Sequence, residues 1–282
     1  MTATNDQTRT IRDAGKMLRD WRQRRHLTQH ELATAAGLST RLLGELETRR
    51  ILPNRDVVLR LTERLELPLR DRNALLIAAG YEAAFPMRPL GDPVLTGVWS
   101  MIEQAVAGHA PYPALALDRR WSIVASNDVL RGMIGGVDPA LLSTPMNWAR
   151  LTLHPAGLAP RIPNLRDWHA CVMTRLRRQF DATGDAAVAD LQEEIGDYPL
   201  PLVPHSGGAA DTVAMPLRLM SVDGLLSFYG ATTVFGTAVD VTLAELTLET
   251  FYPADAETAA IMRRKAPPAT GGPAAERPKA DD

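Results

Sequence analysis

The sequence predicts an α+β fold with two domains: an all-α N-terminal domain of five helices, and a C-terminal domain with a five-stranded antiparallel sheet and helices. Over residues 12–80, apolar residues recur at helical spacing. From residue 114 onwards, two short strand-like runs, a long helical stretch and three further strand-like runs follow one another. Residues 81–97, which contain FPMRPLGDP, are rich in Pro and Gly and read as a linker between the two domains.

Five short helices are expected in the N-terminal domain, residues 12–80. In the first of them, Ala14, Leu18 and Trp21 form one apolar stripe at helical spacing. Pro53 precedes the fourth helix and Gly80 follows the fifth, which fits the usual placing of these residues at helix ends. The helices are expected at about residues 12–25, 28–34, 40–47, 55–65 and 69–79.

The second and third helices carry the signals of a helix-turn-helix unit. The run Thr-Gln-His-Glu that begins at Thr28 is a capping box, in which the Thr28 hydroxyl accepts the Glu31 amide and the Glu31 carboxylate reaches back. Residues 35–38 form the turn, with Gly37 free to adopt a positive φ, and Ser39 caps the third helix. In such a unit the second helix enters the major groove of DNA.

The outward side of the third helix is then expected to contact bases. Arg41 is the best candidate for direct readout, because its guanidinium matches the O6 and N7 acceptors of guanine. Thr40 suits a thymine methyl group or a base edge, Glu45 suits a cytosine amino group or the orientation of Arg41, and Gly44 permits close approach. The remaining contacts are expected to go to phosphates and to set position and salt dependence. The predicted DNA-binding residues are Gln29, Ser39, Thr40, Arg41, Gly44, Glu45, Arg49, Arg50, Asn54 and Arg55.

The charge distribution and a family resemblance both favour DNA as the partner of the N-terminal domain. Residues 1–80 carry 15 Lys+Arg against 10 Asp+Glu, while the rest of the chain is net acidic, which favours a polyanion as the partner of the N-terminal domain. Residues 16–79 resemble the Cro/repressor-type helix-turn-helix of the XRE family, on TQHELA, the small-residue turn and the LE that ends the third helix. The family commonly has a Gly in the loop that follows, where this chain has Thr48-Arg49-Arg50, so the resemblance does not define that loop. The alternative is a five-helix bundle that binds protein rather than DNA.

The C-terminal domain, residues 98–265, is expected to alternate strands and helices. Arg119 and Arg120 alone separate its first two strands, and Asp223-Gly224 joins the third and fourth as a hairpin turn. Pro253 ends the fifth strand. The strands are expected at residues 114–118, 121–126, 215–222, 225–234 and 240–252, the main helices at 98–107, 165–180 and 255–265, and a disordered tail at 266–282.

This order is satisfied by one antiparallel sheet with helices held on one face, and it is the order of a PAS-type sensor domain. The segments PALALDRRWSIVASND, MNWARLTLHP, NLRDW and FGTAVDVTLAELTLETFYPADAET resemble the ligand-binding domain of MmyB-like transcription regulators over roughly residues 95–262. The resemblance implies a PAS-like fold behind the XRE helices. It also implies a hydrophobic pocket for a fatty acid or a similar apolar small molecule.

Such a pocket is expected among the apolar residues that face the helices, most of which form core in any case. A fatty acid also needs a partner for its carboxylate, and Arg150, His154, Arg161 and Arg166 are the candidates. Asn127, Asn147 and Asn164 are expected to cap helices instead, as are Asp240 and Asp255. The predicted ligand-binding residues are Trp121, Ile123, Leu130, Met133, Trp148, Arg150, His154, Trp168, Val172, Leu217, Phe228, Leu246 and Leu248.

Catalysis and metal binding have no support in the sequence. The six His show no metal-binding spacing, GxSxG is absent, and the single Cys171 excludes an intramolecular disulfide and reads as core. No cofactor is obligatory, and the absence of a long apolar run and of a secretory signal predicts a cytoplasmic protein that binds no membrane. The expected function is a regulator that binds double-stranded operator DNA as a homodimer and senses an apolar effector. Two alternatives stay open: a C-terminal domain that only dimerises, and one that carries a cofactor such as flavin or haem.

Overall fold

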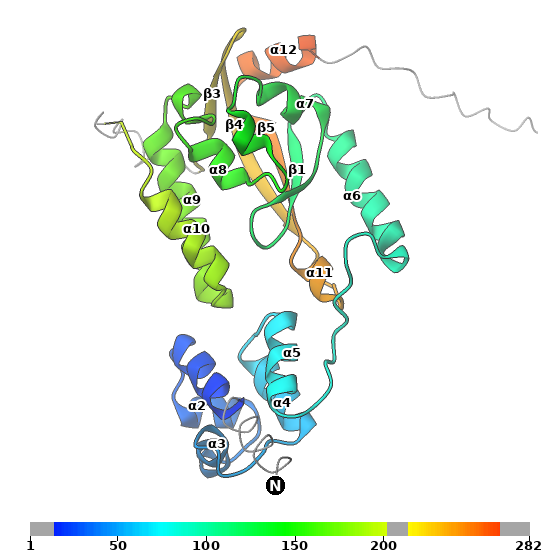
Figure 1. Ribbon diagram of the computed structural model, residues 1–282, viewed down its shortest axis with the longest axis vertical. Coiled ribbons are helices and arrows are strands. Elements are labelled where there is room, and N and C mark those ends of the chain that lie inside the picture. The colour runs from blue at the N-terminus through cyan, green and yellow to red at the C-terminus, as the bar shows by residue number, and fades with distance from the viewer. Residues whose placement is uncertain (1–13, 202–213, 266–282) are drawn as a thin grey trace, which may run out of the picture.

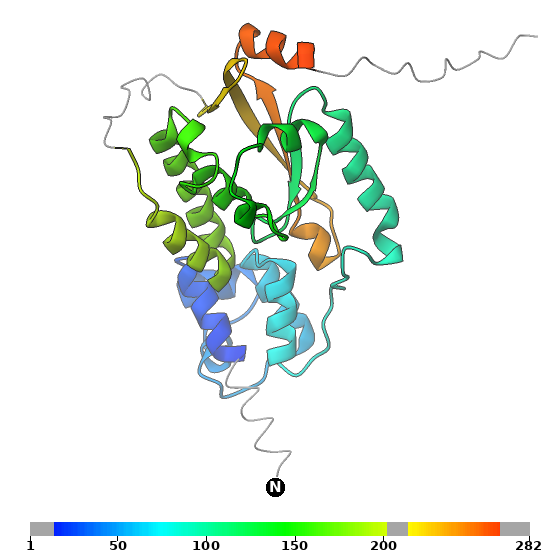
Figure 2. The same cartoon turned by 45° about the horizontal axis from the view of Figure 1, so that its top comes forward.

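The computed structural model describes residues 14–201 and 214–265. The helices of the N-terminal domain lie at one end of the molecule, and the sheet of the C-terminal domain rises above them (Figures 1 and 2). No helix in the described part of the chain is both long and apolar enough to span a bilayer.

The five expected helices of the N-terminal domain are present. The first covers residues 14–24, and it buries Ala14, Leu18 and Trp21 as its periodicity predicted. Its apolar stripe packs against Leu32 and Leu43 in one core. The other four helices are α2 (Gln29–Ala35), α3 (Thr40–Glu47), α4 (Arg55–Arg64) and α5 (Leu69–Ala78).

The C-terminal domain contains a single antiparallel sheet in the order β2-β1-β5-β4-β3. The two expected hairpins form, and β5 lies between them because it pairs with both β1 and β4. The turn between β3 and β4 pairs Ser221 with Gly224, whose φ of 120° is open to Gly but strained for other residues. The strands are β1 (Ala114–Leu117), β2 (Ile123–Ser126), β3 (Leu217–Ser221), β4 (Gly224–Val234) and β5 (Thr247–Pro253).

Helices cover both faces of the sheet, whereas one covered face was expected. On one face, Leu115 and Phe251 pack into the main core with the helices that follow β2. On the other, Ala114 and Ala116 pack against Ile102 of the helix that precedes β1. The helices are α6 (Thr96–Gly108), which covers the second face, and α7 (Asp128–Met133), α8 (Trp148–Leu153), α9 (Leu165–Thr183), α10 (Ala186–Gly196), α11 (Val241–Ala244) and α12 (Ala256–Lys265), with short 3-10 turns at Pro93–Leu95, Pro139–Leu142 and Ala159–Arg161.

The fifth strand starts later than predicted. Residues 241–244 form the helical turn α11, because the Asp240 carboxylate accepts the amides of Thr242 and Leu243 at 2.9 and 3.4 Å. The alternating pattern becomes a strand only at Thr247. The second strand also starts later, since Trp121 has a φ of 65° and leaves the extended conformation. The predicted tail, 266–282, lies outside the described residues.

Three asparagines were expected to cap helices, and two of them do. The Asn127 Oδ1 accepts the Leu130 amide at 3.1 Å, and the Asn147 Oδ1 accepts the Arg150 amide at 3.1 Å. The prediction is wrong for Asn164. Its side chain instead donates to the Pro216 carbonyl at 2.8 Å and so joins α9 to the start of β3.

Candidate nucleic-acid interface and ligand pocket

The helix-turn-helix unit has the capping geometry that its sequence predicts. The Thr28 hydroxyl accepts the Glu31 amide at 3.2 Å, and the Glu31 carboxylate accepts the Thr28 amide at 2.7 Å. The Thr28 hydroxyl also donates to the Glu31 carboxylate at 2.7 Å, and the two bonds from Thr28 to the carboxylate lower the pKa of Glu31. Gly37 takes a φ of 66° in the turn, and the Ser39 hydroxyl accepts the Leu42 amide at 3.1 Å at the start of α3. Both helices of the unit therefore begin with satisfied amide groups.

A buried ion pair fixes α3 against the first helix. Arg22 Nε and Nη2 donate to the two carboxylate oxygens of Glu47 at 2.6 and 2.9 Å, and Glu47 is 2% exposed. Gln29 Nε2 donates to the same carboxylate at 2.8 Å, so three helices meet at this group. Hydrogen bonding to Glu47 raises the pKa of Arg22, which stays charged. Sequence reasoning missed this pair because its members lie 25 positions apart, and the LE motif that contains Glu47 does not identify Arg22 as its partner.

The outward side of α3 presents one long cation. The Arg41 side chain is 88% exposed, and its Nε donates to Glu45 at 3.0 Å, so Glu45 orients the guanidinium along the helix. Thr40 is exposed beside it, and its hydroxyl lies 3.3 Å from His30 Nδ1, a neighbour that sequence reasoning did not single out. Gly44 faces Gln29, since a Cβ at that position would lie 3.7 Å from the Gln29 amide oxygen.

The residues predicted to contact phosphate divide into two groups. Gln29 and Asn54 have structural roles, the first on Glu47 and the second as the cap of α4, where it accepts the Val57 amide at 2.8 Å. Arg50 and Arg55 are exposed at the loop and at the start of α4. Arg49 takes a φ of 65°, so an arginine adopts the left-handed conformation in the loop where a Gly was expected.

Side chains fill the space between the sheet and helices α7–α9. The cavity that remains has a volume of about 10 Å³. Trp121, Leu130, Trp148, Trp168, Val172, Leu217 and Phe228 are buried in this core, and Ile123 and Met133 pack against it. The structure therefore brings nine of the predicted ligand-binding residues together, while their contact with a ligand stays a prediction.

The other four predicted residues lie elsewhere. Leu246 and Leu248 pack against the helix α6 on the second face of the sheet. Arg150 forms a bidentate ion pair with Glu194, at 2.8 and 2.6 Å, which raises the pKa of Arg150 and lowers that of Glu194. His154 Nδ1 accepts the Ala156 amide at 3.0 Å. Neither basic side chain faces the small cavity.

A larger cleft opens at the outer edge of the sheet, between α7, the β3–β4 hairpin and α12. Its volume is about 820 Å³, within the range of ordinary ligand sites. Apolar side chains line most of it, among them Val129, Met220, Leu226 and Met262. Arg161 Nε and Nη1 donate to backbone carbonyls on its wall, and no carboxylate among the described residues pairs with Arg161. Lys265 and Asp128 also line the cleft, but each forms an ion pair, with Asp223 and Arg131 respectively. The cleft thus combines an apolar lining with one cation, Arg161, that has no carboxylate partner among the described residues.

Met133 and Leu219 separate this cleft from the small inner cavity, since both side chains line both spaces. Trp148 lines the inner cavity, and its indole N–H has no acceptor among the described residues; the same holds for the buried Trp168 indole. A buried donor without a partner costs stability. Methionine repacks easily, so the partition between the two spaces is deformable.

In the described part of the chain, neither a metal-binding cluster nor the cysteine adds a reactive site. Among the described residues, no cluster of three or more His, Cys, Asp or Glu has a metal-binding arrangement. Cys171 is half-buried on α9, and burial raises the pKa of its thiol, which disfavours the reactive thiolate.

Two family models match the sequence. The model described as "MmyB-like transcription regulator ligand binding domain" matches residues 98–264, and a helix-turn-helix domain model matches residues 13–75. No curated protein matches the sequence significantly. Among solved structures, an RNA-binding light-oxygen-voltage receptor is similar at 13% identity and a TM-score of 0.27; the alignment covers 93% of this chain and 63% of that one.

Proposed function

The chain belongs to the MmyB-like transcription regulators, a family of DNA-binding proteins with a ligand-binding domain, and from this premise we propose that it senses a fatty acid or a similar amphiphile. The acyl chain lies in the outer cleft at α7, β3 and α12, and the carboxylate lies at Arg161. The protein acts as a homodimer in the cytoplasm, and its C-terminal domain is of the PAS type.

The outer cleft is the observation that carries this proposal. Its volume of about 820 Å³ suits a medium-length acyl chain, and Arg161 supplies a cation whose other neighbours are neutral carbonyls. A fully buried anion needs such a partner. The deformable partition adds support, because a chain that displaces Met133 extends the site into the inner cavity.

Ligand binding and DNA binding are coupled if the two ligands prefer the same conformation. The effector changes operator affinity only by as much as its own affinity differs between the two states, and the coupling is reciprocal. The sign of regulation, the operator sequence and the target genes depend on DNA outside the protein.

Native mass spectrometry of the full chain with tetradecanoic acid or tetradecanol tests the ligand. We expect both to bind, and Arg161→Gln to weaken the acid about tenfold while leaving the alcohol unchanged. Met133→Trp should block both ligands, whereas the control Met101→Trp, on the exposed face of α6, should not. Failure of both ligands to bind would support the alternative in which the domain only dimerises. Flavin or haem absorbance in the purified protein would support a cofactor.

Fluorescence anisotropy on a duplex selected from random sequences tests the N-terminal domain. Arg41→Ala should relax preference at one base pair by about 1–3 kcal/mol. Arg50→Ala should weaken all sequences equally and reduce the salt slope by about 1. Unchanged affinity and preference in both variants would contradict DNA binding by α3, whatever the outcome for the acyl chain.

A further inference from the structure

Two polar contacts hold the N-terminal domain to the C-terminal domain, and the first is at the end of α9. Arg24 Nη1 donates to the Phe180 carbonyl at 2.9 Å, and Arg25 donates to the carbonyls of Asp181 and Ala182 at 3.3 and 3.1 Å. These carbonyls belong to the last helical turn, where a cation is favoured, and that of Phe180 also accepts the Gly184 amide at 2.7 Å. The helix ends at Gly184 with a φ of 64°.

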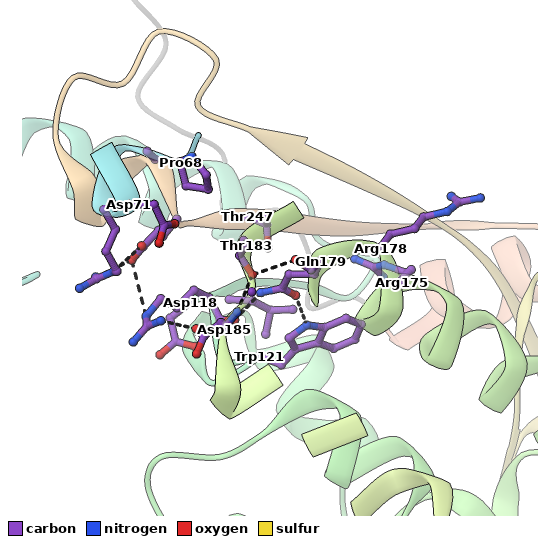
Figure 3. Close-up of a pocket in the computed structure, with 16 residues that line it drawn as sticks. Pro68, Asp71, Asp118, Trp121, Arg175, Arg178, Gln179, Thr183, Asp185 and Thr247 are labelled. Carbon is purple, nitrogen blue, oxygen red and sulfur yellow. Dashed lines mark hydrogen bonds and ion pairs between the residues drawn. The ribbon is translucent and has the colours of Figure 1, made fainter. Parts of the chain in front are cut away.

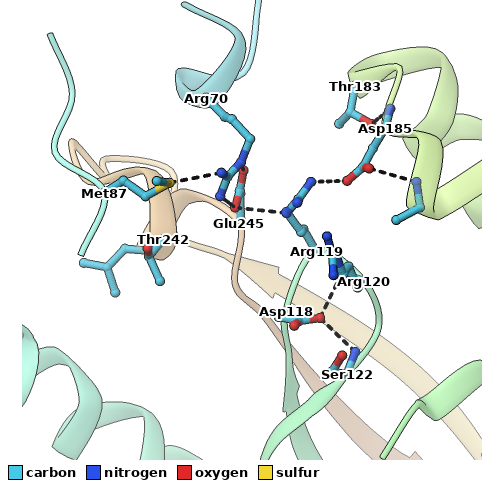
Figure 4. A network of polar contacts seen from close by, with 12 residues as sticks. Arg70, Met87, Asp118, Arg119, Arg120, Ser122, Thr183, Asp185, Thr242 and Glu245 are labelled. Atoms are coloured by element: carbon cyan, nitrogen blue, oxygen red, sulfur yellow. Dashed lines mark hydrogen bonds and ion pairs between the residues drawn. The ribbon is translucent and has the colours of Figure 1, made fainter. Parts of the chain in front are cut away.

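The second contact is an ion-pair network at the start of α5 (Figure 4). Arg70 donates through Nε and Nη2 to both carboxylate oxygens of Glu245, each at 2.7 Å. Arg119 of the β1–β2 turn reaches the same carboxylate at 3.8 Å and forms an ion pair with Asp185. Glu245 therefore joins α5 to the turn of the sheet.

A cleft of about 620 Å³ lies between these two contacts (Figure 3). Pro68 and Asp71 of the N-terminal domain form one wall, and Leu117, Trp121 and Thr247 of the C-terminal domain lie opposite. Trp121 has a φ of 65°, a conformation that bulky residues adopt only where the surroundings hold them. The bond from its indole to Gln179 at 2.8 Å and the Arg175 guanidinium over its ring supply that support.

Most charged groups that line the cleft are already satisfied. Arg70, Arg119, Glu245 and Asp185 belong to the network above, and Arg175 pairs with Glu249 of β5. Asp118 accepts the amides of Arg120 and Ser122, both at 2.8 Å. Two charged side chains on the cleft form no hydrogen bond or ion pair among the described residues: Asp71, which Arg70 and Arg119 stabilise only through longer-range attraction, and the exposed Arg178.

The Asp71 carboxylate is in an unfavourable place for an anion. Burial, and then the negative charge of Glu245, raise its pKa to about 6, although Arg70 opposes the shift. Asp185 also raises it and Arg119 lowers it, so five charged groups from both domains face one another here. A carboxylate with such surroundings gains from any cation that comes within reach.

We propose that the cleft between the two domains is a second binding site, which takes a small molecule with a protonated amine on an apolar body. The amine forms an ion pair with Asp71, and the apolar part packs against Leu117 and the edge of Trp121. Asp71 decides the charge of the ligand, because it is the one carboxylate of the cleft that forms no hydrogen bond or ion pair in the described chain. Of the cations that line the cleft, only Arg178 forms no ion pair in the described chain, and it is already exposed to water. This site is separate from the outer cleft, and it does not depend on whether the N-terminal domain binds DNA.

The test is an NMR titration of the 15N-labelled full chain with 2-phenylethylamine and with its uncharged counterpart 2-phenylethanol. The indole N–H signal of Trp121, assigned with Trp121→Phe, reports on this cleft because Trp121 lines it and does not line the outer cleft. At pH 7.5 the amine should shift that signal with at least about tenfold higher affinity than the alcohol. Asp71→Asn should remove the difference, whereas the control Arg178→Gln, on the same cleft, should preserve it.

The pH dependence of the wild-type protein gives a second test that needs no variant. The affinity for the amine should fall as the pH is lowered through about 6, because protonated Asp71 no longer pairs with a cation. The affinity for the alcohol should stay constant over the same range. Equal affinities for the two probes, the absence of a shift at Trp121, or an amine affinity that is unaffected by both Asp71→Asn and pH would each overturn the proposal.

Discussion

Removal of one partner from the buried Arg22–Glu47 pair should destabilise the N-terminal domain strongly. Glu47→Gln keeps the shape of the side chain and removes its charge, which leaves the Arg22 guanidinium buried without a counter-ion. Glu47 is 2% exposed and Arg22 is 9% exposed, so water cannot replace the lost carboxylate without opening the fold. Breaking a buried pair in this way costs about 3–5 kcal/mol.

The magnitude for Glu47→Gln should fall toward the lower end of that range, at about 3 kcal/mol. The Gln side chain retains one acceptor for Arg22, and Arg22 Nη1 keeps its hydrogen bond to the Leu27 carbonyl at 2.7 Å. The double variant Arg22→Met with Glu47→Leu should recover most of the loss, because apolar residues of similar volume leave no charge to be desolvated. Lys16→Met is the control on the same helix. Its partner Asp20 lies at 3.8 Å and both side chains are more than half exposed, so less than about 0.5 kcal/mol is expected.

Hydrogen–deuterium exchange of peptides from the second and third helices measures this directly, since it reports the local free energy of opening. A loss of about 3 kcal/mol corresponds to protection that is lower by more than about 100-fold. Peptides from β4 and β5 should keep their wild-type protection. A loss under about tenfold for Glu47→Gln, or a double variant no more protected than the single one, would refute the view that an unpaired charge is the cause.

Three further predictions concern stability. Gly184→Ala should lower the free energy of unfolding by about 1 kcal/mol, because it strains a left-handed residue and places a Cβ 3.0 Å from the Arg24 guanidinium. Urea unfolding measures the loss, and a stabilised variant would contradict the prediction. Asn127→Ala should cost about 3 kcal/mol in the same assay, since it removes four hydrogen bonds to buried backbone groups, at 2.8–3.2 Å; a cost under 1 kcal/mol would be inconsistent with that role. Asp71→Asn should stabilise the protein by about 1 kcal/mol at pH 8, after allowance for partial exposure, and by nothing below about pH 4. The folded pKa of Asp71, about 6, lies above the ordinary value, so the stability that the protonated carboxyl contributes is lost as pH rises through 6. The variant is therefore expected to be the more stable protein only at high pH, and equal melting curves at pH 8 would contradict this.

Local signals predicted the parts of the fold that depend on local interactions. The helix-turn-helix unit was predictable because each of its helices carries its own cap, at Thr28 and Ser39, within three residues of the amide that the cap satisfies. The two hairpins were predictable for the same reason, since a short turn fixes the partner of each strand. In these segments sequence neighbours are also neighbours in space.

Contacts between distant segments were not predictable in this way. The Arg22–Glu47 pair, the placing of α6 on the second face of the sheet, and the Arg150–Glu194 pair all depend on tertiary packing. In the stretch around Asp240, alternation favoured a strand, but a single carboxylate that caps two amides turned the first four residues into a helix. Arg161 and Met133 were named as candidates, but the cleft that they share was not predicted, because its walls come from five separate segments.

The positions of the outer cleft and of the cleft between the domains constrain how the binding of an effector can affect the DNA-binding helices. The outer cleft lies beside Leu226, near the far end of β5, whereas Thr247 at the other end of β5 lines the cleft between the domains. Seven residues of extended strand separate these ends by about 20 Å. Glu249 lies between them, 1% exposed, and holds Arg175, which in turn covers the ring of Trp121. A strand that is hydrogen-bonded on both edges moves as a unit. A displacement at the outer cleft can therefore be transmitted through packed side chains to the surface that contacts α5. A ligand in the cleft between the domains needs no such transmission, because it contacts both domains at once. If its affinity differs between two orientations of the N-terminal domain, its binding shifts the position of the DNA-binding helices directly.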